Sequence, residues 1–269
     1  MLELVEKGSC TAAHPVPLLF VHGGWHAAWC WQNFLDFFAG AGYRAVAVSL
    51  RGHGASPTTK PLRSCSIAEY VDDVRAVADQ LADQRGGRPV VIGHSLGGFV
   101  VQRYLEVHRA PAAVLVGSVP PQGVLGLAVR VWRHHPWVAV RAFTGGTLLE
   151  FVNTLALARE HLFCPGTPEA VVEACMSRAQ AESIRASALD PMFRPVRTKR
   201  VTTPMLVLGA EHDGFVSRAD VLATARAYDT EPQFFPGMGH NMMLEPGWMD
   251  VARRIGSWLE ARDLAARSA

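Results

Sequence analysis

The chain has 269 residues, of which 49% are hydrophobic and 19% are charged, and its formal net charge is +2. This size and apolar content suit a well-buried globular core and exclude an intrinsically disordered chain. The 26 basic and 24 acidic residues nearly balance and form no long basic block, so nothing favours nucleic-acid binding.

The cysteines and the first residues of the chain indicate the cellular compartment of the protein. The five cysteines are scattered, odd in number and without C-x-x-C spacing, which favours a reducing cytoplasm over a disulfide framework or a zinc site. Residues 1–7 show no signal-peptide pattern, and no stretch approaches the roughly 18 apolar residues of a membrane span. We therefore expect a cytoplasmic protein without stable membrane insertion. The sequence does not indicate an oligomeric state.

The first half of the chain alternates short apolar runs with segments of helical periodicity. The apolar runs predict buried strands at 18–21, 43–48, 90–92 and 112–116. Helices are predicted at about 29–39 and 66–83, the second opened by a capping box of Ser66 and Glu69. This alternation predicts an α/β fold with a mostly parallel, doubly wound sheet covered on both faces.

The alternation breaks between about residues 118 and 200, which contain helical fragments and prolines but no clear strand. It then resumes, with strands predicted at 204–209 and 231–235 and helices at 217–227 and 248–264. Within the middle stretch, helices are predicted near 148–161 and 168–188. We interpret 118–200 as a helical cap, or lid, inserted into a core domain formed by 1–117 and 201–269.

The most informative motif follows the strand at 90–92, where Gly-His-Ser-Leu-Gly leads directly into a helical pattern. In this G-x-S-x-G arrangement a serine stands at a strained strand-to-helix turn. Gly93 and Gly97 are small enough for backbone and helix to approach closely, and the helix start points N–H groups at negative charge. The motif predicts that Ser95 is a nucleophile.

A serine hydroxyl needs an adjacent base, and the base needs an orienting acid. Asp213 and His240 each follow a predicted strand, so both are expected at the carboxyl ends of strands, where doubly wound sheets build their sites. Glu211 competes for the role of the acid, and Asp213 has an alternative role as a helix N-cap. No grouping of His, Cys, Asp or Glu has metal-ligand spacing, so we predict neither a metal nor another cofactor.

A tetrahedral intermediate of acyl transfer carries an oxyanion that fixed donors must meet. One expected donor is the backbone N–H of Leu96, the residue after the nucleophile. The second is expected from His22–Gly23–Gly24–Trp25, the loop after the first buried strand. The N–H of Trp25 is preferred there, with that of Gly24 as the next choice.

Together these motifs resemble the α/β-hydrolase superfamily, in particular serine esterases with a helical cap. The matching pieces are His22–Trp25, Arg51–Ser56, Gly93–Gly98, Asp213 and Gly239–His240. The resemblance implies the chain order serine, acid, histidine, and its Gly-x-x-x-Asp loop favours Asp213 over Glu211. Residues 22–31 also resemble the plant methylesterase and hydroxynitrile lyase branch. Ser49 stands where many relatives carry aspartate, a change expected to alter loop bracing.

The resemblance implies hydrolysis of a carboxylic ester of a small or medium apolar substrate through an acyl-enzyme. The cap supplies candidates for an apolar substrate wall, any of which has the alternative role of packing the cap on the core: Trp132, Trp137, Phe143, Leu148 and Phe151. Same-fold alternatives are a thioesterase, a carbon–carbon bond hydrolase, a lyase or an acyltransferase. A ligand receptor that retains the triad is a third possibility, because fold alone does not fix function. The partner implied in every case is a small molecule.

Overall fold

Seven strands form one sheet in the computed structural model, which describes residues 1–144, 147–262 and 264; within these the strand order is β1-β3-β2-β4-β5-β6-β7. The strands are β1 (Leu4–Lys7), β2 (Leu18–Val21), β3 (Ala45–Val48), β4 (Val90–His94), β5 (Ala113–Val116), β6 (Met205–Ala210) and β7 (Pro232–Phe235). Strand β1 pairs antiparallel with β3, and every other pair is parallel. The predicted α/β class and mostly parallel sheet are confirmed.

The interior strands are continuous apolar runs because helices cover both faces of the sheet. In β2, Leu19 and Val21 pack into the core on one face, and Leu18 and Phe20 pack into the core on the other. The edge strand β1 has only partly buried or exposed side chains. It therefore lacks the apolar signal of the others, and the sequence analysis did not predict it.

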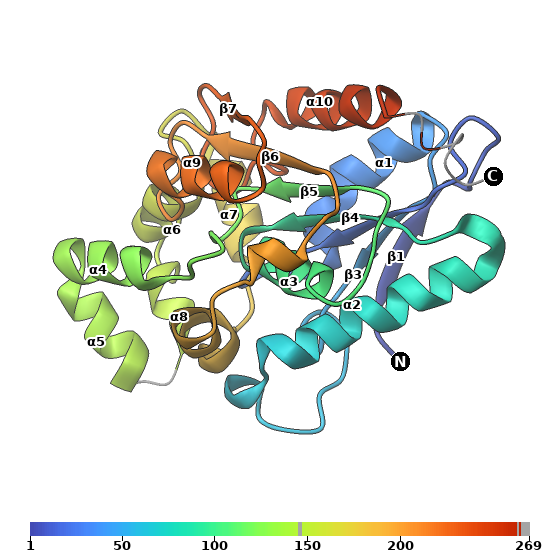
Figure 1. Cartoon of the computed structure of the whole chain (residues 1–269). Helices are drawn as coiled ribbons and strands as arrows, with labels where there is room; N and C mark the ends of the chain where they lie inside the picture. The colour runs from blue at the N-terminus through green and yellow to red at the C-terminus, as the bar shows by residue number, and fades with distance from the viewer. Residues whose placement is uncertain (145–146, 263, 265–269) are drawn as a thin grey trace.

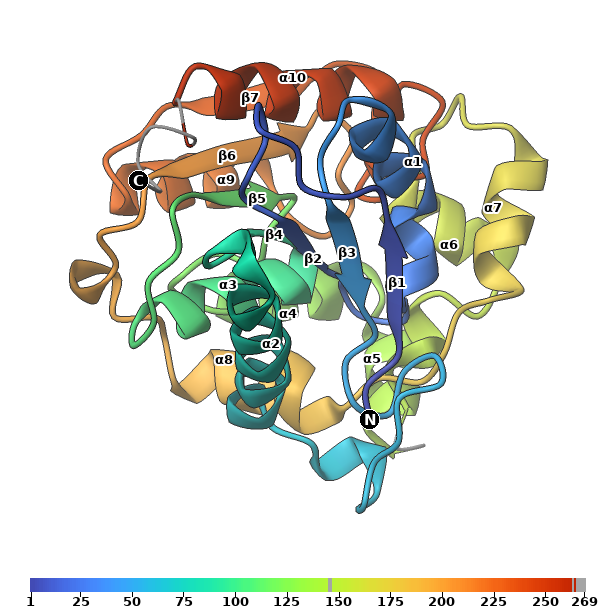
Figure 2. The same cartoon turned by 90° about the vertical axis from the view of Figure 1, so that its right-hand side faces the viewer.

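The helices divide between the two faces of the sheet. Helices α1 (Gln32–Gly40) and α10 (Trp248–Glu260) contact each other on one face, and α2 (Ile67–Leu81) and α3 (Ser95–Leu105) contact each other on the opposite face (Figure 2). Helix α9 (Arg218–Ala227) buries its apolar side chains on the α2–α3 face. The predicted capping box is present at the start of α2, where the Ser66 hydroxyl accepts from the N–H of Glu69.

Between β5 and β6 the described residues contain helices and no strand. These are α4 (Leu125–His134), α5 (Pro136–Thr144), α6 (Leu155–Leu162), α7 (Glu169–Met176) and α8 (Asp190–Phe193). Helices α4 to α7 gather at one end of the sheet (Figure 1). This arrangement is consistent with a cap, while the division into 1–117 with 201–269 and 118–200 stays a prediction.

Shorter turns complete the structure. They are the 3-10 turns Ala28–Trp31, Leu62–Ser64, Leu148–Phe151 and Thr198–Arg200 and the π-helical turns Ala82–Gly86 and Arg185–Leu189. The helix predicted near 148–161 is thus a 3-10 turn followed by α6, because the Thr154 hydroxyl caps α6 by accepting from the N–H of Leu157. The helix predicted at 168–188 ends at Met176. Among the described residues, no helix combines the length and apolar character needed to cross a bilayer.

Candidate active site

Ser95 stands at the sharp turn between β4 and α3. Its φ is +51°, in the left-handed region that is costly for a residue with a side chain. A Cβ on Gly93 would lie 2.5 Å from the carbonyl oxygen of Gly97, and a Cβ on Gly97 would lie 2.2 Å from that of His22. Only glycine permits these approaches, which explains both glycines of the motif.

Three side chains far apart in sequence form one hydrogen-bonded series. The Ser95 hydroxyl and His240 Nε2 are 2.8 Å apart, and His240 Nδ1 is 2.8 Å from Oδ2 of Asp213. The His240 and Asp213 side chains are each 1% exposed. The other carboxylate oxygen of Asp213 accepts from the N–H groups of Phe215 and Val216 at 2.9 and 2.7 Å. A carboxylate fixed in this way holds the proton on Nδ1 and leaves Nε2 free to accept from Ser95.

Asp213 rather than Glu211 therefore faces the imidazole. The Glu211 side chain is more than half exposed, and its carboxylate accepts from the backbone N–H of Gly237 at 2.9 Å. The alternative role of Asp213 as a helix cap is taken by Ser217, whose hydroxyl accepts from the N–H of Asp220 at the start of α9.

Gly117, directly after β5, lies beside the bond between acid and base. Its φ is +49°, and a Cβ there would lie 3.3 Å from Asp213 Oδ2 and 3.5 Å from His240 Nδ1. A larger residue would press on both partners of the hydrogen bond. Glycine at this position therefore leaves room for the hydrogen bond between Asp213 and His240 and also permits the positive φ.

The loop His22–His26, here called the oxyanion loop after its predicted role, is held by its own histidines. The His22 Nδ1–H donates to the carbonyl of Gly23 at 2.8 Å, and the His26 Nδ1–H donates to that of Gly24 at 2.6 Å. The tautomer of His22 is fixed because its Nε2 accepts from the N–H of Leu50 at 3.0 Å. Two successive carbonyls of the loop are thereby turned toward these rings.

This arrangement orients the predicted oxyanion donors. The peptide bonds are trans, so the N–H of Trp25 points opposite to the Gly24 carbonyl that His26 holds. Trp25 adopts a φ of +65°, and its own carbonyl accepts from the N–H of Gln180 at 2.9 Å. The N–H of Leu96 belongs to the first turn of α3, where no intrahelical acceptor exists. The loop and the helix start thus offer fixed donors near Ser95.

Burial keeps three histidines around the site neutral, namely His22, His26 and His94. Desolvation lowers the pKa of His26 to about 4 and the pKa values of His22 and His94 well below the ordinary range, and neighbouring histidines add to the effect. Neutral rings can donate from one nitrogen and accept at the other. These three histidines therefore act as hydrogen-bonding braces.

A cavity of about 420 Å³ opens at Ser95, and helices α4 and α5 contribute to its wall. Its lining is mainly apolar and includes Gly24, Trp25, Leu96, Val124, Leu127, Val131, Trp132, Ala139, Leu148, Phe151, Met192, Phe215 and Val216. Of the predicted wall residues, Trp132, Leu148 and Phe151 line this cavity. Trp137 is 78% exposed and is not among the described lining residues, because its side chain points outward from α5. The Phe143 side chain lies outside the described residues.

The site also contains residues that the sequence did not predict. Phe215 stacks against Trp25 and against His161, with ring centroids 5.3 and 4.9 Å apart. It thereby connects the loop after β6, which carries Asp213, to the oxyanion loop and to α6. The polar residues Glu182 and Ser187 also line the cavity. No local pattern marks these residues, because distant segments create their surroundings.

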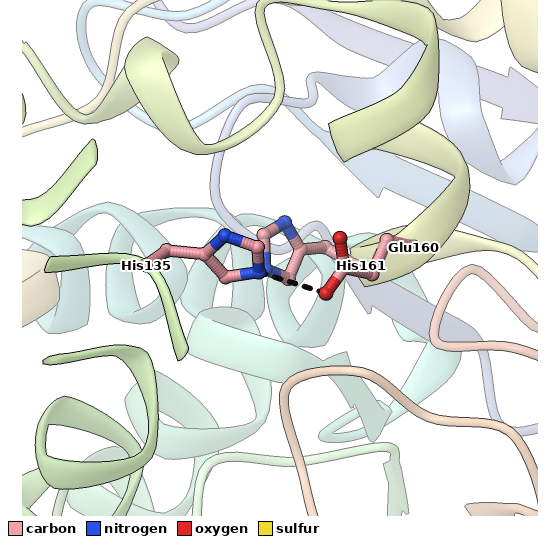
Figure 3. Close-up of side chains that lie close together, drawn as sticks. All are labelled: His135, Glu160 and His161. Atoms are coloured by element: carbon pink, nitrogen blue, oxygen red, sulfur yellow. Dashed lines mark hydrogen bonds and ion pairs between the residues drawn. The ribbon is translucent and has the colours of Figure 1, made fainter. Parts of the chain in front are cut away.

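One group of possible metal ligands lies beside the site in the cap. His135, Glu160 and His161 bring ligand atoms within 4.8 Å of one another (Figure 3). The His135 Nε2 lies 2.7 Å from Glu160 Oε1, and the His161 Nδ1–H donates to the carbonyl of Phe151 at 2.9 Å. Sequence spacing did not predict this group, because residue 135 is far from 160 and 161 along the chain. An ion pair between His135 and Glu160 accounts for the geometry as it stands.

A doubly wound sheet with a serine at its strained β4–α3 turn is the arrangement typical of α/β hydrolases. Comparisons with known proteins identify the family. The model of the alpha/beta hydrolase family matches residues 18–252. A non-heme haloperoxidase from Rhodococcus erythropolis is 29% identical over 248 residues, which cover 84% of this chain and 86% of that protein. A non-heme chloroperoxidase from Streptomyces lividans is 42% identical over 109 residues, but the match spans only 39% of this chain and 38% of that protein.

Solved structures agree on the fold. A thermophilic esterase from Thermogutta terrifontis superimposes with a TM-score of 0.77 at 22% identity, covering 97% of this chain and 94% of that one. The chain belongs to the alpha/beta hydrolase family.

Proposed function

We propose that the protein is a serine hydrolase that cleaves a carboxylic ester of a small or medium, largely apolar substrate. The observation that carries the proposal is the series Ser95–His240–Asp213, which is buried, hydrogen-bonded throughout and open to an apolar cavity. A nucleophile hydrogen-bonded to a base, itself oriented by an acid, is the arrangement needed for acyl transfer.

In the first half-reaction the Ser95 oxygen attacks the ester carbonyl while its proton passes to His240 Nε2. The carbonyl oxygen becomes an oxyanion, which the N–H groups of Trp25 and Leu96 stabilise. One such donor typically contributes about 2.7–4 kcal/mol to the transition state. The intermediate collapses to an acyl-enzyme, and the departing alkoxide takes the proton from His240 and leaves as the alcohol.

In the second half-reaction water replaces the alcohol. His240 takes a proton from water as the water oxygen attacks the acyl carbon, and a second oxyanion forms in the same position. Its collapse breaks the bond to Ser95, which recovers its proton from His240 as the acid is released. Asp213 remains ionised throughout and keeps the imidazole in the productive orientation.

A panel of p-nitrophenyl esters and matching thioesters of graded acyl length tests this proposal. We expect turnover of esters, with kcat/KM rising with acyl length until the 420 Å³ cavity is filled, and loss of turnover in Ser95→Ala. Preference for the thioesters would favour the thioesterase alternative. Tight binding of esters without turnover would favour a ligand receptor and contradict the proposal.

The relatives named non-heme haloperoxidase favour a second candidate, acyl transfer to hydrogen peroxide. Peroxide in place of water would attack the acyl-enzyme and release a peracid, and Ser95 would regain its proton as in hydrolysis. The test is bromide oxidation in acetate buffer with hydrogen peroxide. Oxidation that depends on acetate, peroxide and Ser95 together supports this second activity.

A further inference from the structure

Few polar side chains interrupt the apolar lining of the cavity, and two of them come from one short segment. Besides Ser95 and the exposed Arg133, the charged or hydroxyl-bearing side chains among the described lining residues are Glu182 and Ser187. Both lie at the π-helical turn Arg185–Leu189 or just before it. Such turns occur often at functional sites because they displace side chains from regular helical positions.

Glu182 is a carboxylate buried in this wall, with a side chain that is 1% exposed. Its Oε1 accepts from the hydroxyl of Tyr70 at 2.8 Å and from the N–H of Ser183 at 2.6 Å. Its Oε2 lies 3.2 Å from Nε2 of His53, but the two atoms are not aligned for a hydrogen bond. Burial opposes the charged form of His53, but the facing carboxylate of Glu182 and backbone hydrogen bonds together raise its pKa. The pair balances its charge while Oε2 keeps an unused acceptor site.

The Ser187 hydroxyl is also buried without a hydrogen-bond partner among the described residues. A buried polar atom left unpaired costs free energy, and native structures seldom keep one without a reason. Here a buried unused acceptor and a buried unused hydroxyl belong to two residues, five positions apart in the chain, that line the same cavity. A ligand hydroxyl, which both donates and accepts, matches these two groups.

The oxyanion loop lies against both Ser95 and Glu182, and so relates the position of this polar wall to that of Ser95. A Cβ on Gly23 would be 2.8 Å from Cβ of Ser95, whereas a Cβ on Gly24 would be 3.7 Å from Cγ and 3.8 Å from Oε2 of Glu182. Adjacent loop residues thus lie against the nucleophile and against the carboxylate. A group bound at Glu182 is therefore close to the carbonyl that Ser95 attacks.

We propose that Glu182 and Ser187 form a polar subsite that binds a hydroxyl group of the substrate within a few bonds of the scissile carbonyl. The hydroxyl donates to Glu182 Oε2, and its oxygen accepts from the Ser187 hydroxyl. Because His53 already balances the charge of Glu182, a neutral donor suits the site better than an ammonium group. This inference rests on the proposed ester hydrolysis and narrows its substrates to hydroxylated, otherwise apolar esters.

Matched esters test the subsite. Methyl 3-hydroxyoctanoate is compared with methyl octanoate, and 2-hydroxyethyl octanoate with ethyl octanoate, while methyl 8-hydroxyoctanoate carries its hydroxyl far from the carbonyl. We expect kcat/KM to favour at least one of the first two hydroxy esters by about tenfold or more over its partner. Equal rates within each pair, or preference only for the 8-hydroxy ester or for an aminoalkyl ester, would overturn the proposal.

Variants assign the preference to the two side chains. Ser187→Ala and Glu182→Gln should each reduce the hydroxy-to-plain ratio of kcat/KM by about fivefold to tenfold. Ser177→Ala and Glu173→Gln change the same residue types at exposed cap positions and should leave the ratio unchanged. Since the Ser187 hydroxyl has no described partner to lose, that variant keeps the test valid if Glu182→Gln folds poorly. An unchanged ratio in Ser187→Ala contradicts its role.

A binding measurement separates this inference from the proposed reaction. Calorimetric titration of Ser95→Ala with 3-hydroxyoctanoate, octanoate, 1,2-octanediol and 1-octanol requires no turnover. Tighter binding of a hydroxylated ligand, lost in the double variant Ser95→Ala/Ser187→Ala, supports the subsite even if no ester is hydrolysed. Equal affinities within both pairs overturn the subsite even if ester hydrolysis is established.

Discussion

His94, the residue before Ser95, donates a hydrogen bond from Nε2 to the backbone carbonyl of His240 at 2.9 Å. Both residues are buried, so water cannot replace this bond. Strand β4, which directly precedes Ser95, is thereby linked to the loop that carries His240. The position of the His240 imidazole relative to Ser95 therefore depends on the His94 side chain.

Replacement of His94 tests this link. His94→Ala leaves the His240 carbonyl unpaired, which should lower the free energy of unfolding by about 1–3 kcal/mol. A displaced imidazole should also lower kcat on p-nitrophenyl esters by about tenfold or more. His94→Gln retains an N–H donor of similar reach and should recover part of both losses. Wild-type kcat in His94→Ala would show that the loop of the base holds its position without the bond.

The assignment of the acid is tested by Asp213→Asn. An amide can hold the imidazole in place but favours the wrong tautomer, and the same change in a serine protease lowers kcat about 10⁴-fold. We expect a loss of that order here, measured as kcat at neutral pH. Glu211→Gln, which changes the exposed neighbouring carboxylate, should stay within about twofold of the wild type. A larger effect at Glu211 than at Asp213 would reverse the assignment.

Gly117→Ala tests the packing against the bond between acid and base. The left-handed backbone and the close approach to Asp213 and His240 should together cost about 1–3 kcal/mol of stability and lower kcat by about tenfold or more. Gly40→Ala is the matched control, because an added Cβ meets no atom within 4 Å there. If Gly117→Ala is as active as Gly40→Ala, the close packing at residue 117 does not matter to the site.

Stability should fall as the pH is lowered because buried neutral histidines must take up protons. For His26 the pKa is about 4 in the folded state against about 6.5 when unfolded, so the unfolded state binds more protons between these values. Its contribution is complete above about pH 6.5 and is lost as the pH falls through 4, a change on the order of 3 kcal/mol. Urea unfolding at stepped pH measures this slope. His26→Gln should flatten it, and an unchanged slope would contradict the contribution of His26.

Chelation tests the prediction that the reaction needs no metal. The proposed nucleophile, base and acid are all side chains, so prolonged treatment with EDTA should leave kcat/KM unchanged. The opposite result would be that EDTA abolishes activity and Zn²⁺ restores it in the wild type but not in His135→Ala. That result would assign a metal to the His135–Glu160–His161 group.

The sequence predicted the sheet and the serine turn because both depend on local pattern. Buried parallel strands are continuous apolar runs, and the turn at Ser95 requires Gly93 and Gly97 within five residues. The edge strand β1 escaped because one side of it faces solvent and its residues are mixed.

The cap was harder to predict. Helix α4 has no buried residue, although Trp132 on it lines the cavity. Hydrophobicity alone therefore could not distinguish Trp132 from Trp137 of α5, which faces outward. Glu182 follows Gln180 and Ala181 in a stretch typical of a surface. Its burial is decided by Tyr70 and His53, more than a hundred residues away.

Covalent capture asks whether Ser95 is the reacting nucleophile. A fluorophosphonate should add one phosphonyl group per chain, located on Ser95 by peptide mass mapping, with the loss of ester hydrolysis in proportion to labelling. Ser95→Ala should neither be labelled nor turn over esters. Labelling at another residue, or a Ser95→Ala variant that still hydrolyses esters at the wild-type rate, would exclude Ser95 as the nucleophile.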